Sequence, residues 1–308
     1  MYKMKAAICT KYGAPEVLKI VEVVKPTPND GEILIKIMAS AVNYGDTRVR
    51  RLDEKGILRI AMPFVLGFGK PRKPILGASF SGFIEQKGKN VTRFNIGDEV
   101  FGLTGWKMGA HAQYVTISEK GMVAKKPSNA TFEEAAAIPF GAHTAIYFLE
   151  KAKIQEKPCQ KVLIYGATGS VGAAAIQIAK HYNAEVTTVC SEAGQKLVKE
   201  LCADHCILYD KEDFTKRNEK FDIIFDAVGK ISKKQCTDLL NSNSRYVTVT
   251  GLNPAKERTA QLELLRSLFE NRKYNATIDK VFLFDEIVEA HRYVDTGRKK
   301  GNVVIKIS

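Results

Sequence analysis

The sequence predicts an α/β protein in which a doubly wound parallel sheet follows a region of short β-strands. Three observations predict this fold class. From residue 161 onward, strand-like runs alternate with helix-like runs, as in parallel sheets with crossover helices. The preceding chain, to about residue 125, holds short apolar runs punctuated by glycine and proline, which is typical of β structure. A glycine-rich turn separates the first strand of the alternating region from its first helix.

The N-terminal region is expected to begin with a strand in MYKMKAAICTKYG. Further strands are expected at EILIKIMASAV (32–42), FSGFIEQKG (80–88), GDEVFGL and HAQYVTIS. Loop 49–75 is long and punctuated by proline, and we interpret it either as a lid or as a packed crossover with exposed lysines. Thr131, followed by Glu133 and Glu134, predicts the start of a helix, since acids in the first turn favour the helix dipole.

The alternating region is expected to supply five strands and their helices. The strands are KVLIYGA, EVTTVC, CILYD, FDIIFDAVG and RYVTVTG, with helices over about 170–182 and 192–202. A later helix, TAQLELLRSLFENRK, carries Leu262, Leu265, Leu268 and Phe269 on one face, which is the pattern of a helix that packs on a core. FDEIVEAHRYVDTG predicts another helix, and GNVVIKI a last strand.

Composition excludes several classes of protein. With 45% hydrophobic and 26% charged residues, the 308-residue chain is expected to be a soluble globular protein. No apolar run approaches the roughly 20 residues of a membrane span, and the amino terminus lacks secretory signal features, so we expect a cytoplasmic protein with no membrane partner. The net charge is +13, but the lysines are spread out and no aromatic-interleaved basic motif is present. We therefore do not expect nucleic-acid binding; a basic surface or attraction for an anionic ligand explains the charge.

The six cysteines predict free thiols rather than a disulfide framework, since they form no CxxC pair and follow no export signal. Cys202, His205 and Cys206 are spaced closely enough to suggest a metal site. They fall where a helix end runs into a strand, however, and small buried thiols are common there. No metal is therefore expected.

The glycine turn is Gly166-x-x-Gly169-x-x-Gly172, directly after a strand and directly before a helix. Glycines there let the backbone turn tightly and approach a pyrophosphate, while the helix amino terminus offers N–H groups to the anion. The alternative is close packing of helix on strand with no ligand. Dinucleotide binding is the interpretation that we adopt.

The choice between NAD and NADP is decided at the end of the second strand, where an acid would bind the adenosine ribose hydroxyls. Cys190 and Ser191 stand there instead, so a 2′-phosphate is not repelled and Ser191 could donate to it. Glu192 follows directly and could reach the ribose after a small shift. The sequence therefore favours NADPH and leaves NADH open.

Several motifs in family order resemble the medium-chain dehydrogenase/reductase superfamily, in its zinc-independent quinone oxidoreductase branch. They include MKAAICTKYGAPEVLKI, ASAVNYGDTRVR, GASFSGFIEQKGKNVTRFNIGDEVFG, TFEEAAAIPFGAHTAIYFL, VLIYGATGSVGAAAIQIAK, FDAVG and YVDTGRKKGNVVIKI. The resemblance implies a GroES-like β-barrel-type domain over 1–125 and 276–308, and a Rossmann domain over 126–275. It also implies an active cleft between the two.

The resemblance argues against zinc. Where zinc-dependent members have a cysteine and a His-Glu pair, this chain has Asn43 and Ala78-Ser79. AAIPFGAHTA has no cysteine, and residues 85–125 lack the four-cysteine lobe. Without a Lewis acid, conjugated acceptors such as quinones and enones are the easier substrates, because they need less polarisation.

The resemblance implies a set of site residues. The acceptor is expected to meet Asn43, Tyr44, Asp46 and Arg48; the alternative for Arg48 is a solvent-facing ion pair with Asp46. The cofactor is expected to contact Thr144, Gly166, Thr168, Gly169, Ser170, Val171, Gly172, Ser191, Tyr209, Val228, Gly229, Thr250, Gly251 and Leu252. Many NADPH-using members have a lysine where Gly194 stands, and Lys196 is a candidate replacement. His111 and His143 are interpreted as packed, hydrogen-bonded histidines rather than acids.

The sequence thus predicts a reductase of quinones or other α,β-unsaturated carbonyls that uses NADPH. Two alternatives stay open: a zinc-free NAD(P)-dependent aldehyde or ketone reductase, and an NADPH-binding sensor or adaptor with little turnover. The connection from Gly251 to the next helix is short, which suggests that the sheet ends one strand early. Because family members pair through that edge strand, the sequence leaves a homodimer open.

Overall fold

The computed structural model describes residues 2–52, 57–250, 255–256 and 258–308. The chain divides into two compact units. The first, which we call the β unit, comprises Met1–Pro139, Arg258–Glu270 and Ile278–Ser308. The second, the Rossmann unit, comprises Phe140–Glu257 and Asn271–Thr277. Among the described residues, no helix is both long and apolar enough to cross a bilayer.

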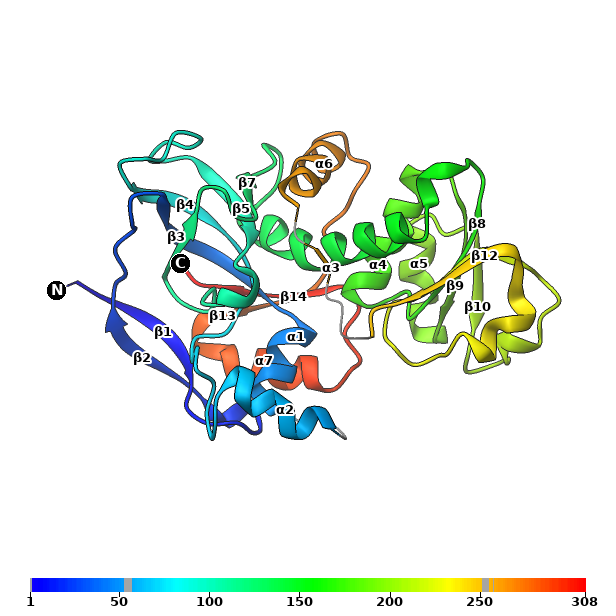
Figure 1. Ribbon diagram of the computed structural model, residues 1–308, viewed down its shortest axis with the longest axis horizontal. Coiled ribbons are helices and arrows are strands. Elements are labelled where there is room, and N and C mark those ends of the chain that lie inside the picture. The colour runs from blue at the N-terminus through cyan, green and yellow to red at the C-terminus, as the bar shows by residue number, and fades with distance from the viewer. Residues whose placement is uncertain (1, 53–56, 251–254, 257) are drawn as a thin grey trace. The chain divides into compact units, whose positions relative to one another are not determined.

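The β unit is built on a seven-stranded sheet (Figure 1). Its strands are β3 (Glu32–Val42), β4 (Ser79–Lys87), β5 (Glu99–Leu103), β6 (Tyr114–Ser118), β7 (Val123–Lys125), β13 (Ile278–Leu283) and β14 (Asn302–Lys306). The order is β13-β14-β3-β4-β5-β7, with β6 also paired to β3. A separate antiparallel pair is formed by β1 (Lys3–Cys9) and β2 (Leu18–Val24).

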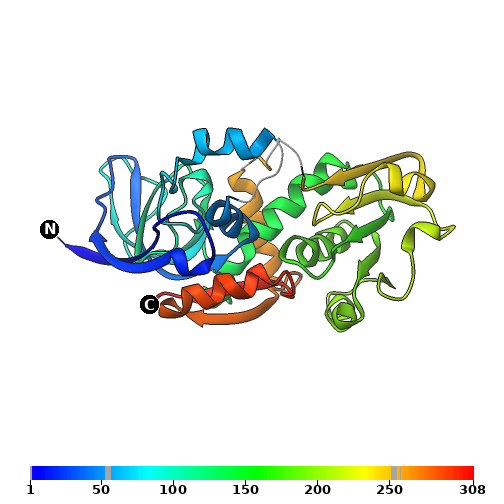
Figure 2. The same ribbon diagram turned by 90° about the horizontal axis from the view of Figure 1, so that it is seen from below.

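Helices complete the core of the β unit. α7 (Ile287–Asp295) lies alongside β13, as the red helix and orange strand of Figure 2 show. It presents Ile287, Ala290 and Val294 to a core that includes Ile35 of β3. α1 (Tyr44–Arg51) packs against α7 and begins where β3 ends. This places the polar residues 43–48 at one end of the longest strand.

The Rossmann unit contains a five-stranded parallel sheet, which confirms the predicted fold class. Its strands are β8 (Lys161–Tyr165), β9 (Glu185–Cys190), β10 (His205–Leu208), β11 (Phe221–Asp226) and β12 (Leu240–Thr248). The order β10-β9-β8-β11-β12 reverses direction between β8 and β11, where doubly wound sheets bind their ligands. Within the described residues the sheet has five strands, as the short connection after Gly251 predicts.

The helices around this sheet are α4 (Ser170–His181) and α5 (Gln195–Glu200), with a 3-10 turn at Glu192–Gly194 before α5. α3 (Phe132–Lys151) begins as predicted at Thr131, whose hydroxyl accepts a hydrogen bond from the Glu134 N–H at 3.1 Å. In return, the Thr131 N–H donates to the Glu134 carboxylate at 2.8 Å. This reciprocal pair satisfies two N–H groups that a helix start otherwise leaves unpaired.

Helix α6 (Thr259–Glu270) groups by contacts with the β unit, although the predicted domain limits assign it to the Rossmann domain. It packs near β7, and Thr259 Oγ1 donates to the Gly121 carbonyl at 3.3 Å. Its buried face includes Leu262, Leu265, Leu268 and Phe269, as the spacing predicts. The limits 1–125 with 276–308 and 126–275 therefore stay a prediction.

Helix α2 (Ile57–Leu66) lies in the segment that we interpreted as a lid or crossover loop. The proline and glycine content of that segment concealed the helix, because Pro63 lies within its last turn. Sequence reasoning also missed α1, β2, β7 and β13, which are short or lack clear alternation.

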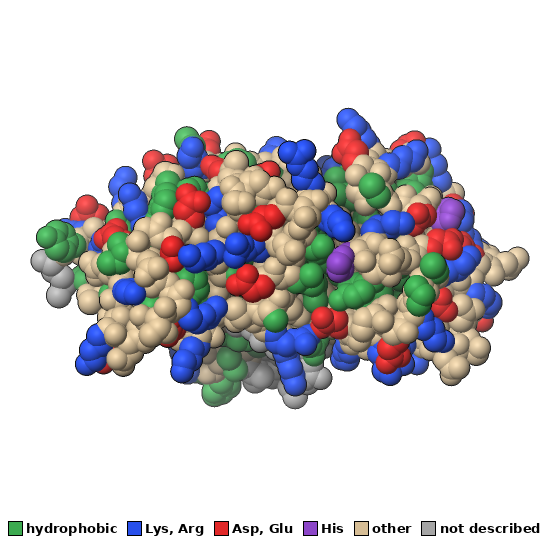
Figure 3. All heavy atoms as spheres, turned by 90° about the horizontal axis from the view of Figure 1, so that it is seen from above, with side chains coloured by type: hydrophobic (Ala, Val, Ile, Leu, Met, Phe, Trp, Pro, Cys, Tyr) green, Lys and Arg blue, Asp and Glu red, His purple; other side chains and the backbone are tan. Residues whose placement is uncertain are grey.

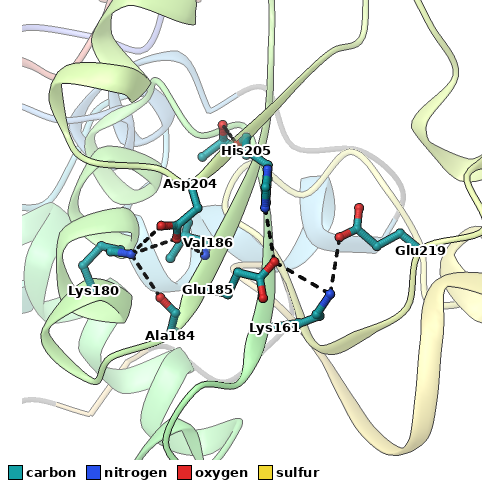
Figure 4. Close-up of polar contacts among 9 residues, drawn as sticks. Lys161, Lys180, Ala184, Glu185, Val186, Asp204, His205 and Glu219 are labelled. Atoms are coloured by element: carbon teal, nitrogen blue, oxygen red, sulfur yellow. Dashed lines mark hydrogen bonds and ion pairs between the residues drawn. The ribbon is translucent and has the colours of Figure 1, made fainter.

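A polar network lies at the amino-terminal edge of the parallel sheet (Figure 4). The glycine turn follows the other end of β8. Asp204 accepts from the Val186 N–H at 2.7 Å and from Lys180 Nζ at 2.8 Å. His205 Nε2 contacts the Glu185 carboxylate at 3.2 Å.

The network also bears on the suggested metal site. Because neighbouring residues of a strand point to opposite faces, Cys206 lies away from His205, with its Sγ 3.6 Å from Cys190 Sγ. The structure therefore does not bring Cys202, His205 and Cys206 together.

The surface carries charges of both signs. On the face drawn in Figure 3, lysine and arginine side chains are interspersed with aspartate and glutamate side chains.

Candidate dinucleotide and acceptor site

The three glycines of the turn differ in how much space a side chain would have at each position. Gly166 has φ +76°, and a Cβ there would lie 2.6 Å from Val228 Cγ1. A Cβ on Gly172 would lie 2.2 Å from the Gly166 carbonyl oxygen, so this glycine lets α4 pack closely on the turn. Gly169 differs, because its nearest neighbour would be 3.8 Å away and its φ is −75°. None of the described residues requires a glycine there, whereas a pyrophosphate that approached the turn would.

This difference predicts opposite effects for two alanine substitutions. Gly169→Ala is expected to lower NADPH affinity about tenfold with little change in thermal stability, because its Cβ would meet a bound pyrophosphate but closely approaches none of the described residues. Gly172→Ala is expected to lower the free energy of unfolding by about 1–3 kcal/mol, because its Cβ overlaps backbone atoms. Cofactor titration and thermal denaturation of both variants measure the two effects. Unchanged affinity in Gly169→Ala would contradict the assignment.

The end of β9 carries the residues that are expected to contact the adenosine end of the cofactor. Ser191 follows β9 and is half-buried, and Tyr209 is exposed. The Glu192 N–H donates to the Asp210 carboxylate at 3.0 Å, and the Glu192 carboxylate pairs with Lys211 Nζ at 2.5 Å. Glu192 is thus engaged by Lys211, and Asp210 is an acid at this edge that sequence reasoning missed.

Gly194 has a structural explanation. A Cβ there would lie 2.4 Å from Thr168 Cγ2, a methyl group of the glycine turn. A lysine at this position would therefore require the Thr168 side chain to move. Lys196, the suggested replacement, is exposed on α5 and lies 3.8 Å from the Glu200 carboxylate.

Asp226, the last residue of β11, organises the loop that follows it. Its Oδ1 accepts hydrogen bonds from the N–H groups of Val228 (3.2 Å), Gly229 (2.8 Å) and Lys230 (3.3 Å). Its Oδ2 accepts from the Ile231 N–H at 3.2 Å. The Thr248 hydroxyl of β12 adds a donor at 3.2 Å, while the Tyr246 hydroxyl, 3.4 Å from Oδ2, donates to the Ile231 carbonyl at 2.6 Å. The side chain is fully buried, so this carboxylate holds the Val228–Gly229 backbone in place.

Further contacts bring the cofactor candidates to one edge of the sheet. A Cβ on Gly229 would lie 2.1 Å from Thr250 Cγ2, and Gly166 packs on Val228. Gly141 of α3 lies against the Ser170 carbonyl, while Thr144 Oγ1 donates to the Phe140 carbonyl at 2.9 Å. The residues after β8, β11 and β12 therefore meet at the carboxyl edge, at the reversal of strand order. Gly251 and Leu252 lie outside the described residues.

In the β unit, Asn43 is the N-cap residue of α1 and is only 2% exposed. Its N–H donates to Asp46 Oδ2 at 2.7 Å, and the Gly77 N–H donates to Asp46 Oδ1 at 3.2 Å. Burial raises the pKa of Asp46 to about 7, an effect that these N–H donors partly offset. Asp46 therefore joins the start of α1 to the Gly77 turn.

Tyr44 and Arg48 are exposed and lie four residues apart on α1, on one face of the helix. The Arg51 guanidinium lies 5.7 Å from the centre of the Tyr44 ring. The alternative of a solvent-facing Asp46–Arg48 ion pair does not hold, because Asp46 is buried and both of its oxygens accept backbone N–H groups.

A buried polar cluster lies beneath α1. His111 Nδ1 is 3.1 Å from Ser40 Oγ, and its ring meets that of His291 edge to face at 5.5 Å. Both ring nitrogens of His291 lack a hydrogen-bond partner among the described residues. Arg50 is fully buried and pairs with Asp295. Burial lowers the pKa of His111 to about 3 and that of His291 well below its usual value. His111 is thus a packed, hydrogen-bonded histidine, as predicted, and His143 is buried as well.

The residues at the zinc-ligand positions have other partners. Ser79 Oγ donates to the Ala136 carbonyl at 2.9 Å, and the Ser79 carbonyl accepts from Ser40 Oγ at 2.8 Å. Asn43 Nδ2 lies 3.4 Å from the Ala41 carbonyl oxygen. Across the described residues, no three histidine, cysteine, aspartate or glutamate side chains are grouped to hold a metal ion.

Comparison with known proteins identifies both units. Residues 29–128 match the alcohol dehydrogenase GroES-like domain, and residues 170–279 match the zinc-binding dehydrogenase domain. A 2-methylene-furan-3-one reductase of Solanum lycopersicum is 35% identical over 98% of this chain and 79% of its own length. An Arabidopsis thaliana protein named NADPH-dependent alkenal/one oxidoreductase, chloroplastic, is 30% identical with the same coverage. The quinone oxidoreductase of Coxiella burnetii superposes with a TM-score of 0.87 at 28% identity, covering 100% of both chains.

Proposed function

Because this chain belongs to the medium-chain dehydrogenase/reductase family, in its quinone oxidoreductase-like branch, we propose that it reduces quinones or other α,β-unsaturated carbonyls with NADPH and without zinc. The observation that carries the cofactor part is Gly169, whose identity no contact with the described residues explains. The relatives are named as reductases of a methylene-furanone and of alkenals or enones, and these names support the acceptor class.

NADPH, when bound, supplies a hydride for the electrophilic carbon of the acceptor. Gly169 admits the pyrophosphate, and the amino terminus of α4 favours its charge. Asp226 keeps the Val228–Gly229 backbone in the position where the nicotinamide ribose is proposed to bind. On the β unit, Tyr44 and Arg48 offer exposed donors that would stabilise charge developing on the acceptor oxygen. Asn43 and Asp46 act in this proposal by holding the start of α1.

The donors at the ligand positions of zinc enzymes support the proposal of zinc independence. Asn43 offers an amide and Ser79 a hydroxyl already donated to Ala136, whereas zinc sites are built from thiolate, imidazole or carboxylate ligands. A conjugated acceptor accommodates this loss better than a simple ketone, because its π system already spreads the developing charge.

The preference for NADPH rests on Ser191 and predicts the effect of an acid there. Ser191→Asp is expected to lower NADPH affinity about tenfold and to leave NADH affinity nearly unchanged, since a carboxylate repels the 2′-phosphate. Titration with both cofactors measures the ratio, and Ser191→Ala is the uncharged control. An NADH preference in the unmodified protein would indicate that Glu192 or Asp210 reaches the ribose.

The test of function is oxidation of NADPH by a panel of quinones, enones, simple aldehydes and ketones, followed by loss of its absorbance. Turnover with quinones or enones supports the proposal, and turnover with simple aldehydes or ketones alone would favour a carbonyl reductase. Tight NADPH binding without turnover on any acceptor would favour a sensor or adaptor. The cytoplasmic location expected from the sequence stays part of the proposal; the Arabidopsis relative is named as chloroplastic.

A further inference from the structure

Helix α2 ends in a group of exposed apolar side chains. Phe64, Val65 and Phe68 are 62%, 61% and 65% exposed. The Phe64 and Phe68 rings meet edge to face with their centres 5.0 Å apart. A single exposed apolar residue is ordinary, but three within five positions indicate an interaction site.

The segment that carries these side chains is folded and anchored. The Gly67 N–H donates to the Pro63 carbonyl at 2.8 Å, and the Arg72 N–H donates to the Leu66 carbonyl at 2.6 Å. The Tyr12 hydroxyl donates to the Gly67 carbonyl at 2.9 Å, which ties the turn to the rest of the β unit. The apolar side chains therefore project from a folded element, and α2 lies at the periphery of the β unit in Figures 1 and 2.

Basic residues follow the apolar ones directly. Lys70, Arg72 and Lys73 are exposed, and among the described residues none of them forms an ion pair with a carboxylate. Lys73 Nζ lies 3.3 Å from the carbonyl oxygen of Trp106, whose side chain is 64% exposed. We call Phe64, Val65, Phe68, Lys70, Arg72 and Lys73 the apolar–basic patch.

We propose that the apolar–basic patch docks this protein on the surface of an anionic lipid bilayer. Aromatic side chains favour the boundary between acyl chains and headgroups, and unpaired lysines and arginines are attracted to anionic headgroups. The net charge of +13 adds long-range attraction of the same sign. Such docking requires no spanning helix, so it agrees with the absence of a span among the described residues. The inference is independent of the proposed reaction.

The experiment is co-sedimentation of the full chain with vesicles of phosphatidylcholine alone or with about 30% phosphatidylserine. Binding is expected with the anionic vesicles, with a decrease at high salt. Phe64→Ser/Phe68→Ser and, separately, Lys70→Ala/Lys73→Ala are each expected to lower the partition coefficient about tenfold. The matched controls are Ile96→Ser, an equally exposed apolar residue, and Lys233→Ala/Lys234→Ala; both are expected to bind normally.

A fluorescence reporter distinguishes insertion from surface attraction. Trp106 is the only tryptophan, so Trp106→Phe/Phe68→Trp places a single indole in the patch. Its emission is expected to shift to shorter wavelength when anionic vesicles are added. An unshifted emission from vesicle-bound protein would overturn the proposal.

Three other results would overturn it. The first is no binding to anionic vesicles. The second is an equal decrease in the partition coefficient for Lys70→Ala/Lys73→Ala and for the control Lys233→Ala/Lys234→Ala. The third is self-association in the absence of vesicles that Phe64→Ser/Phe68→Ser abolishes. The second would assign binding to net charge alone, and the third would assign the patch to a second copy of the chain.

Discussion

Replacing Asp226 by asparagine is expected to lower NADPH affinity at least about tenfold and the free energy of unfolding by about 2–4 kcal/mol. The buried carboxylate accepts from four consecutive N–H groups, beginning with Val228. An asparagine keeps one acceptor oxygen and turns its NH₂ toward N–H donors, so some of them lose their partners. The Val228–Gly229 backbone then leaves the position proposed for the nicotinamide ribose.

Asp222 provides the matched control for this prediction, because it lies on the same strand at the opposite edge of the sheet. Its carboxylate accepts from the Lys161 N–H at 2.9 Å and from Asn241 Nδ2 at 3.0 Å. Asp222→Asn is expected to reduce stability without changing NADPH affinity. Cofactor titration well below the unfolding temperature separates the two effects. Equal affinity losses in both variants would show that Asp226 acts only through stability.

The β unit is expected to lose stability in acid because of its buried histidines. The pKa of His111 is lowered to about 3, and that of His291 is lowered by burial, by His111 and by Arg50. Below pH 6.5 these two histidines bind protons in the unfolded chain but stay neutral in the folded chain. The free energy of unfolding therefore falls as the pH falls. The decrease is at most about 1.4 kcal/mol per pH unit for each histidine.

Asp46 acts in the opposite direction over part of this range. Its pKa is raised to about 7, so the folded chain keeps a proton that the unfolded chain releases above about pH 4. Its contribution to stability is therefore present at low pH and is lost as the pH rises through 7. Between pH 4 and 6.5 the proton that Asp46 releases on unfolding offsets the proton that one of the two histidines binds. For these three groups, about one proton is therefore still bound on unfolding, and the free energy of unfolding falls as the pH falls.

The measurement is chemical denaturation between pH 4.5 and 7.5, followed by the fluorescence of Trp106, which lies in the β unit. His291→Leu removes one buried imidazole whose nitrogens have no partner among the described residues. It is expected to reduce the acid-side slope by about 1.4 kcal/mol per pH unit. His205→Gln is the control, because it replaces an exposed histidine of the Rossmann unit and leaves the β unit, where Trp106 reports, unaltered. An unaltered slope in His291→Leu would contradict the prediction.

Features encoded by contiguous residues could be predicted from the sequence. The glycine turn needs only the strand before it and the helix after it, and the strand predicted at 32–42 coincides with β3 (Glu32–Val42). The Thr131 helix start is a local hydrogen-bond pair and was predicted for the same reason.

Features that depend on neighbours distant in the sequence could not be predicted. Gly194 stands where many NADPH-using members have a lysine, and its contact with the Thr168 methyl group across the turn is not visible in the sequence. Asp226 lies within the motif FDAVG, but it holds the loop after β11 through N–H groups of that loop and a hydroxyl of β12, and the motif alone does not indicate these contacts. Contact of Asn43 with the acceptor stays a prediction, and the structure adds that Asn43 is the buried N-cap residue of α1.

The position of β14 has a consequence for how the protein is made. This strand, Asn302–Lys306, lies between β13 and β3 in the middle of the sheet of the β unit. During translation, therefore, β3 gains β4 and β6 early, but its residues 39–42 lack their β14 partner until residue 306 has left the ribosome, whereas the whole Rossmann unit has emerged by Thr277. We expect the cofactor-binding unit to fold first on the ribosome, while the exposed flank of β3 is the surface that chaperones must protect.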